Sequence, residues 1–236
     1  MDAETRKLAS EAKDLLSRGL FGPAIAAARE VLKDCGEKGT AADMHAVCAI
    51  ALIGTGRNAE GVEQADLCLA VKADRADVLS ARGWAMHMQG KTTEGLKNLE
   101  KASLLDAGDA ETHYRLGIAF MELDLWEEAD GAFSAALEIF TEDDRRAEAC
   151  YNRARCREGG GLIEEAMADY DVAFGLGYQQ AIHDLMRLRE KYGSAGDDED
   201  DIYEGDDLYG SDGEFSDGDY YDGDDVDGYS NRNDDW

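Results

Sequence analysis

Residues 110–143 read AETHYRLGIAFMELDLWEEADGAFSAALEIFTED, and this stretch decides the fold because the chain repeats it. Similar stretches start at Thr5, Ala42, Ala76, Ala110 and Ala147, in steps of 37, 34, 34 and 37 residues. Self-similarity at one period of roughly 20 to 50 residues indicates an architecture of like units stacked along one axis. We expect each of the two longer steps to contain one repeat plus three loop residues.

Small side chains recur at two fixed places in every repeat, where the eighth and twentieth positions hold only Ala or Gly. Two helices cross closely only where side chains are nearly absent, so Ala or Gly at two fixed places in all five repeats is the pattern expected of closely crossing helices. The fifteenth position suits a turn residue that leaves the helical region. The eighth positions are Ala12, Ala49, Gly83, Gly117 and Ala154, the twentieth are Ala24, Gly61, Gly95, Ala129 and Ala166, and the fifteenth are Gly19, Gly56, Gly90, Asp124 and Gly161.

These positions resemble the tetratricopeptide repeat family, whose units are pairs of antiparallel helices. The resemblance implies an all-α, right-handed superhelical solenoid of about five helix pairs over residues 5–192. In residues 179–193 the apolar side chains lie at helical spacing, which predicts the C-terminal capping helix that an open solenoid needs. We expect residues 193–236 to form a disordered, acidic tail. The apolar residues of the predicted capping helix are Ile182, Leu185, Met186 and Leu188.

The resemblance also implies that partners bind in a concave groove lined by the first helix of each pair. The groove positions are mostly apolar or aromatic and are flanked by Asp43, Asp77, Glu111 and Glu148. This composition suits an amphipathic, partly basic peptide or helix, although each side chain could instead pack between neighbouring first helices. We expect Trp84 to be exposed. The candidate groove residues are Val47, Ile50, Ile53, Trp84, Met88, Tyr114, Arg115, Ile118, Met121 and Tyr151.

The best-known members of the family hold the C-terminal carboxylates of heat-shock chaperones with Lys, Asn and Arg side chains on three consecutive units. In the second to fourth units the corresponding positions read Ala46, Ile50, Ala81, Glu111 and Arg115. This set cannot hold two carboxylates, so the sequence argues against that class of ligand.

The formal charge of −29 is concentrated towards the C-terminal end. Residues 194–236 contain eighteen Asp and Glu but only one basic residue, Arg232, which leaves −12 for residues 1–193. Aromatic rings recur at six-residue spacing in this glycine-rich stretch, so we expect an extended chain that presents apolar anchors. Ser211 and Ser216 each lie three residues before an acid and are candidate phosphorylation sites. The candidate anchors are Tyr203, Tyr209, Phe215 and Tyr221.

Acidic segments with an aromatic anchor resemble the tails of histone chaperones and of chaperones for ribosomal proteins. One interpretation is therefore a non-enzymatic scaffold whose groove binds a peptide while the tail screens a basic client protein. The alternative is an adaptor subunit of a larger ciliary, trafficking or co-chaperone assembly. In that case the tail is only a solubilising spacer, or an autoinhibitor that docks in its own groove.

Several other functions are disfavoured by the sequence. The acidic charge repels nucleic acid and anionic lipid. The four histidines lie in separate repeats, and Gly159–Gly161 lacks the lysine and hydroxyl of a phosphate-binding loop, so we expect no catalysis, cofactor, metal site or small-molecule substrate. The N-terminus does not resemble a secretory signal and no apolar stretch is long enough to span a membrane. Five cysteines without CxxC spacing predict free thiols, and hence a cytoplasmic or nuclear protein.

Overall fold

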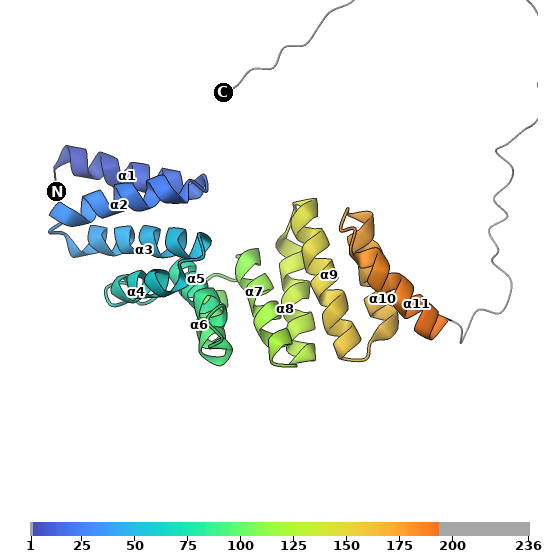
Figure 1. Cartoon of the computed structure of the whole chain (residues 1–236). Coiled ribbons are helices and arrows are strands. Elements are labelled where there is room, and N and C mark those ends of the chain that lie inside the picture. The colour runs from blue at the N-terminus through green and yellow to red at the C-terminus, as the bar shows by residue number, and fades with distance from the viewer. Residues whose placement is uncertain (1, 194–236) are drawn as a thin grey trace, which may run out of the picture. The chain divides into compact units, whose positions relative to one another are not determined.

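The computed structural model describes residues 2–193, which are helical apart from short connections (Figure 1). The helices form five consecutive pairs followed by a final helix, and the first helices of successive pairs also contact one another. The predicted all-α solenoid is confirmed. The helices are α1 (Ala3–Ser17), α2 (Phe21–Asp34), α3 (Lys38–Gly54), α4 (Asn58–Leu69), α5 (Ala76–His87), α6 (Thr92–Leu105), α7 (Ala110–Glu122), α8 (Trp126–Ile139), α9 (Asp143–Gly159), α10 (Ile163–Gly175) and α11 (Ala181–Tyr192).

The small positions of the repeat lie where the two helices of each pair cross, and all ten are buried. There is no room there for larger side chains. A Cβ atom on Gly61 would lie 2.4 Å from Cγ1 of Ile53, and one on Gly117 would lie 2.6 Å from the ring of Phe133. Real Cβ contacts are not this short, so the Ala and Gly pattern follows from the helix crossings.

The turn between the helices of every pair contains a residue in the left-handed region, as the fifteenth position predicts. Four are glycines, with φ between 71° and 82°, and the fifth is Asp124, with φ of 58°. Glycine adopts this conformation without steric cost, and aspartate is among the residues that tolerate it best. The same position therefore ends the first helix of all five pairs.

The prediction that the longer steps contain three extra loop residues is wrong. The connections 35–37 and 140–142 are only three residues long, and the extra residues instead lengthen α3 and α9 at their N-terminal ends to 17 residues each. At the start of α9, Asp143 and Asp144 lie in the first turn, where carboxylates interact favourably with the helix dipole. The start of α3 has a hydrogen bond of 3.2 Å from the Thr40 hydroxyl to the Glu37 carboxylate.

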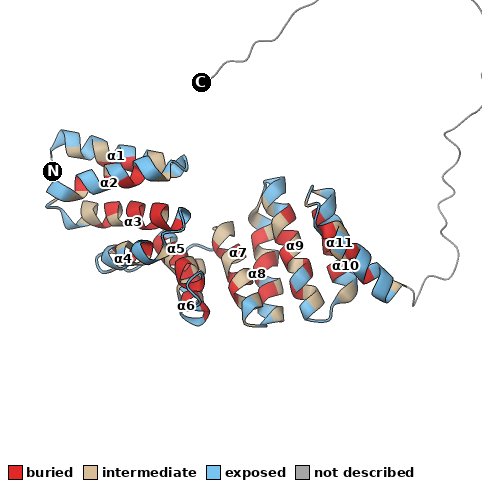
Figure 2. Ribbon diagram, in the orientation of Figure 1, coloured by how far each residue is buried: buried red, intermediate tan, exposed pale blue. Residues whose placement is uncertain are grey.

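The core is a series of small clusters that join neighbouring helices, as expected for a solenoid in which each unit contacts only the next (Figure 2). The last cluster includes Tyr170 of α10 and Leu185 and Leu188 of α11, all fully buried. The predicted capping helix is therefore present. Its buried side does not include Met186, which is 60% exposed.

A buried ion-pair cluster fixes the fifth helix pair. Asp169 of α10 is only 4% exposed and accepts two hydrogen bonds of 2.7 Å from the guanidinium of Arg153 and one of 3.0 Å from Arg157. Arg157 also donates to Asp130 of the preceding pair at 2.5 Å. Two arginines of α9 thus connect three helices, because a buried carboxylate needs such partners.

Candidate protein-binding face

The candidate groove residues lie on α3, α5, α7 and α9 or at their ends, on the side of the solenoid formed by the first helices. We call this side the first-helix face. The structure divides the candidates into three groups. Met88 is 51% exposed; Ile50, Trp84, Arg115, Ile118, Met121 and Tyr151 are half-buried; and Val47, Ile53 and Tyr114 are buried.

The buried members contribute mainly to packing, which is the alternative that the sequence leaves open for each of them. Val47 belongs to the core cluster shared by α1, α2 and α3. The ring of Tyr114 packs edge-on against Phe133, with 5.8 Å between ring centroids, and its hydroxyl donates to Glu148 at 2.9 Å. Burial and the nearby Glu148 carboxylate raise the pKa of Tyr114, so this hydroxyl stays protonated as a donor.

Trp84 is half-buried, with contacts from two successive first helices. Its ring stacks on His87 at 4.9 Å, and the guanidinium of Arg115 on α7 lies 5.9 Å from the ring centroid. His87 is itself held by Glu122, with 2.8 Å between Nδ1 and Oε2. These contacts fix the orientation of the indole, so its exposed part is a rigid apolar surface next to Met88.

The four acids that flank the candidate groove all form ion pairs with basic side chains of the solenoid. Asp43 binds Lys13 at 3.0 Å, Lys72 at 2.5 Å and Arg75 at 3.0 Å. Partial burial opposes ionisation of Asp43, but the hydrogen bonds from the two lysines prevail and lower its pKa. Asp77 pairs with Arg75 at 2.5 Å.

Glu111 and Glu148, the other two flanking acids, are joined by one arginine. Arg145 binds Glu148 at 2.6 Å and also pairs with Glu111, and its guanidinium lies 4.9 Å from the ring of Tyr114. Arg115 adds a second contact to Glu111 at 3.1 Å. The flanking acids are therefore already neutralised, and they give the first-helix face little net attraction for a basic peptide.

A hollow of about 310 Å³ lies at the C-terminal end of the first-helix face, lined mainly by α9 and α11 with Tyr170 of α10. Arg187 donates to both carboxylate oxygens of Glu158, at 2.7 and 2.9 Å, and to Asp184 at 3.0 Å. The hydroxyls of Tyr151 and Tyr170 donate to Asp184 and Glu158 at 2.9 and 3.1 Å. The hydrogen-bonded wall of this hollow is thus fixed before any ligand arrives.

Sequence reasoning missed Arg155, which also lines this hollow. It is exposed, and within residues 2–193 its guanidinium forms no ion pair, unlike that of Arg187. A signal was available, because Arg155 occupies the ninth position of its repeat, as Trp84 does in the third and Ile118 in the fourth. An exposed guanidinium with no ion pair among residues 2–193 has the chemistry to bind a carboxylate.

The histidines and cysteines of the described residues have structural surroundings. His45 hydrogen-bonds Gln64 at 2.8 Å, and His113 hydrogen-bonds the carbonyl of Ala107 at 3.0 Å. All five cysteines are free thiols, and burial raises the pKa of Cys48. Between residues 2 and 193, no three His, Cys, Asp or Glu side chains are grouped closely enough to hold a metal ion, and no helix is long and apolar enough to cross a bilayer.

The candidate anchors Tyr203, Tyr209, Phe215 and Tyr221 and the candidate phosphorylation sites Ser211 and Ser216 lie outside the described residues.

Comparison with known proteins identifies the fold. The sequence matches no protein-family profile and no curated protein. Among solved structures, one of MamA is similar with a TM-score of 0.61 and 23% identity, over 75% of this chain and 99% of the MamA chain. YrrB, described as a TPR protein with an unusual peptide-binding site, is similar with a TM-score of 0.59 and 20% identity, over 75% of this chain and 89% of the YrrB chain. The chain therefore has the tetratricopeptide repeat fold.

Proposed function

We propose that this protein is a non-enzymatic binding scaffold whose first-helix face holds a peptide or helix of a partner protein. The observation that carries the proposal is the apolar surface around Trp84, in a chain of which one third of the residues are charged. Met88 follows Trp84 by one helical turn and is exposed, while Ile118 and Met121 are half-buried on the adjacent α7. Rigid aromatic rings and adaptable methionines provide much of the affinity at such surfaces.

The hollow between α9 and α11 extends this surface with polar groups. A ligand that runs across α5, α7 and α9 would place apolar side chains near Trp84 and a carboxylate near Arg155. The unusual peptide-binding site described for YrrB is consistent with this mode of action, and the assignment to this chain rests on its own residues, because fold alone does not determine function. The ligand that fits best is an amphipathic segment with an acidic group at one end.

Hydrogen exchange tests this assignment. Peptides that bind the full chain would be selected by display, and amide exchange would be followed with and without a selected peptide. We expect added protection in α5, α7 and α9. Protection confined to the second helices α4, α6, α8 and α10 would contradict the proposal.

A finer part of the proposal concerns basic clients. Because the flanking acids of the first-helix face are paired, most of the attraction for a basic protein would come from residues 194–236, which carry −17 of the −29 formal charge. We propose that this segment screens a client of the histone or ribosomal-protein type in the cytoplasm or nucleus, and that its aromatic side chains occupy apolar pockets on the client. The support is the composition and the six-residue spacing of the rings.

Deletion of residues 194–236 tests this part separately. With core histones as the probe, the deletion should lower affinity at least about tenfold and flatten its dependence on salt. A matched chain in which Tyr203, Tyr209, Phe215 and Tyr221 are replaced by serine keeps the charge and tests the rings alone. Unchanged histone binding after deletion would favour the adaptor function, with the tail as a spacer.

A further inference from the structure

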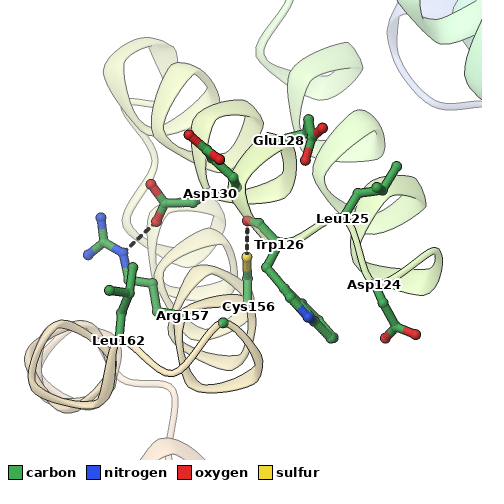
Figure 3. A pocket seen from close by; sticks show the side chains of 10 residues that line it. Asp124, Leu125, Trp126, Glu128, Asp130, Cys156, Arg157 and Leu162 are labelled. Atoms are coloured by element: carbon green, nitrogen blue, oxygen red, sulfur yellow. Dashed lines mark hydrogen bonds and ion pairs between the residues drawn. The ribbon is translucent and has the colours of Figure 1, made fainter.

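A second cavity lies away from the first-helix face, at the edge of the solenoid where the turns of the fourth and fifth pairs meet (Figure 3). Its volume is about 540 Å³, and none of the candidate groove residues lines it. One wall is the α7–α8 turn with the first turn of α8, and the other is the end of α9 with the turn that follows. The lining residues are Asp124, Leu125, Trp126, Glu127, Glu128, Asp130, Cys156, Arg157, Gly160 and Leu162.

Packing next to this cavity explains the glycine run Gly159–Gly161, which lacks the residues of a phosphate-binding loop. Gly161 has a φ of 82°, which the turn requires. Gly159 and Gly160 instead leave room for Trp126. A Cβ atom on Gly159 would lie 2.9 Å from the Trp126 ring, and one on Gly160 would lie 3.3 Å from Cβ of Trp126. The two glycines therefore leave room for the side chain of Trp126, which lines the cavity.

The polar groups inside the cavity are mostly occupied. Arg157 is bound by Asp130 at 2.5 Å and by Asp169 at 3.0 Å. The thiol of Cys156 donates to the carbonyl of Trp126 at 2.9 Å, and burial raises its pKa to about 11, so it remains neutral (Figure 3). Neither group is available to bind an anion.

Three carboxylates at the rim remain without a basic partner in the described part of the chain: Asp124, Glu127 and Glu128. Beside them the side chains of Leu125 and Leu162 are 38% and 48% exposed. The cavity thus combines the apolar side chains of Leu125, Trp126 and Leu162 with carboxylates that have no basic partner among residues 2–193. An anion would be repelled, whereas a basic side chain beside an apolar one would satisfy both features.

We propose that this cavity is a second docking site, which takes a segment of a partner protein carrying an arginine or lysine next to an apolar side chain. Arginine fits best, because its planar guanidinium binds carboxylates and also stacks on an indole. The site differs from the first-helix face in location and in charge preference, and it does not depend on the function proposed for that face. One partner could bind both sites, which would raise its overall affinity.

The repeat provides a matched control for the test. Glu127 and Glu128 in the first turn of α8 correspond to Glu164 and Glu165 in the first turn of α10, and only the first two line the cavity. Both pairs interact with a helix dipole, so Glu→Gln changes should affect folding alike. The variants are E127Q/E128Q and E164Q/E165Q, both in the full chain, where the acidic tail contributes equally.

The probe is a fluorescein-labelled peptide of alternating arginine and leucine, and its binding is followed by fluorescence anisotropy. We expect E127Q/E128Q to weaken binding about fivefold and E164Q/E165Q less than twofold at about 0.15 M salt. A peptide of alternating glutamate and leucine should not bind. Equal losses in the two variants, or no binding of the arginine peptide, would overturn the proposal.

Fluorescence of Trp126 supplies a second readout. The variant W84F/W236F leaves Trp126 as the only tryptophan of the three in the chain. Adding the arginine peptide should change its emission, and E127Q/E128Q should reduce that change. Unchanged emission at concentrations where anisotropy reports binding would place the peptide elsewhere and refute the cavity as its site.

Discussion

Gly83 and Gly95 face each other where α5 crosses α6. A Cβ atom on Gly83 would lie 2.7 Å from the carbonyl oxygen of Gly95, and one on Gly95 would lie 2.5 Å from the carbonyl oxygen of Gly83. Both obstacles are backbone atoms, which cannot move aside as a side chain can. The close packing of the third helix pair therefore requires glycine at both positions.

Gly83→Ala should destabilise the protein by about 2 kcal/mol, because overpacking at the crossing exceeds the gain in helix propensity. Gly131→Ala is the matched control. Gly131 lies inside α8 with nothing within 4 Å of its Cβ position, so this change should stabilise by about 0.5 to 1 kcal/mol. Urea unfolding of both variants measures the two effects. A gain in stability from Gly83→Ala as well would show that the crossing is not closely packed.

Asp169→Ala should lower the free energy of unfolding by about 3 kcal/mol, because it leaves the partly buried Arg153 and Arg157 without a carboxylate that both of them bind. Asp171→Ala, on the same helix, removes only an exposed contact of 3.7 Å to Arg189 and should change stability by less than about 0.5 kcal/mol. Thermal unfolding of the two variants compares them directly. Similar losses of stability in the two variants would mean that the burial of Asp169 does not determine how much it contributes to stability.

Glu158 should contribute to the acid sensitivity of the fold. Hydrogen bonds from Arg187 lower its pKa below the ordinary value of 4.5, against an opposing effect of partial burial. A folded pKa below the unfolded one stabilises the protein above the unfolded value, and this contribution is lost as the pH falls through the folded value. The melting temperature of Glu158→Gln should therefore fall less than that of the native protein below about pH 4.5.

The control for this prediction is Glu164→Gln. Glu164 is exposed and has no ion pair among residues 2–193, so this change removes a carboxylate without breaking an ion pair and should reduce the loss of stability in acid less than Glu158→Gln does. If Glu158→Gln follows the native curve, the contacts with Arg187 contribute nothing to stability in solution.

The helix pairs could be predicted from the sequence because the crossings allow only Ala and Gly, and the turns require a left-handed residue. Those constraints act on single positions, so a fixed spacing reveals them. The lengths of α3 and α9 could not be predicted, because three extra residues fit a loop or a helix equally well by spacing. Neither helix begins with a side-chain cap of a backbone N–H, and of the two only α9 has acidic residues in its first turn.

The candidate face was harder to predict, because sequence position gives the side of a helix but not how neighbouring helices cover it. Val47 and Trp84 both lie on first helices, yet Val47 is enclosed by α1 and α2 while part of Trp84 remains open. The ion pairs of the candidate face could not be predicted from the sequence either. Asp43 binds Lys72 and Arg75 from more than 28 residues away, which a scan for local charge patterns does not detect.

The affinity of a display-selected peptide for three variants tests the central claim most directly. Trp84→Ala and Met88→Ala remove apolar surface from the first-helix face, whereas Leu104→Ala removes a leucine that is 87% exposed on the second helix α6. We predict that the first two variants each weaken binding about tenfold and that Leu104→Ala leaves it unchanged. Native affinity in Trp84→Ala and Met88→Ala, with a loss in Leu104→Ala, would contradict the assignment of the binding face.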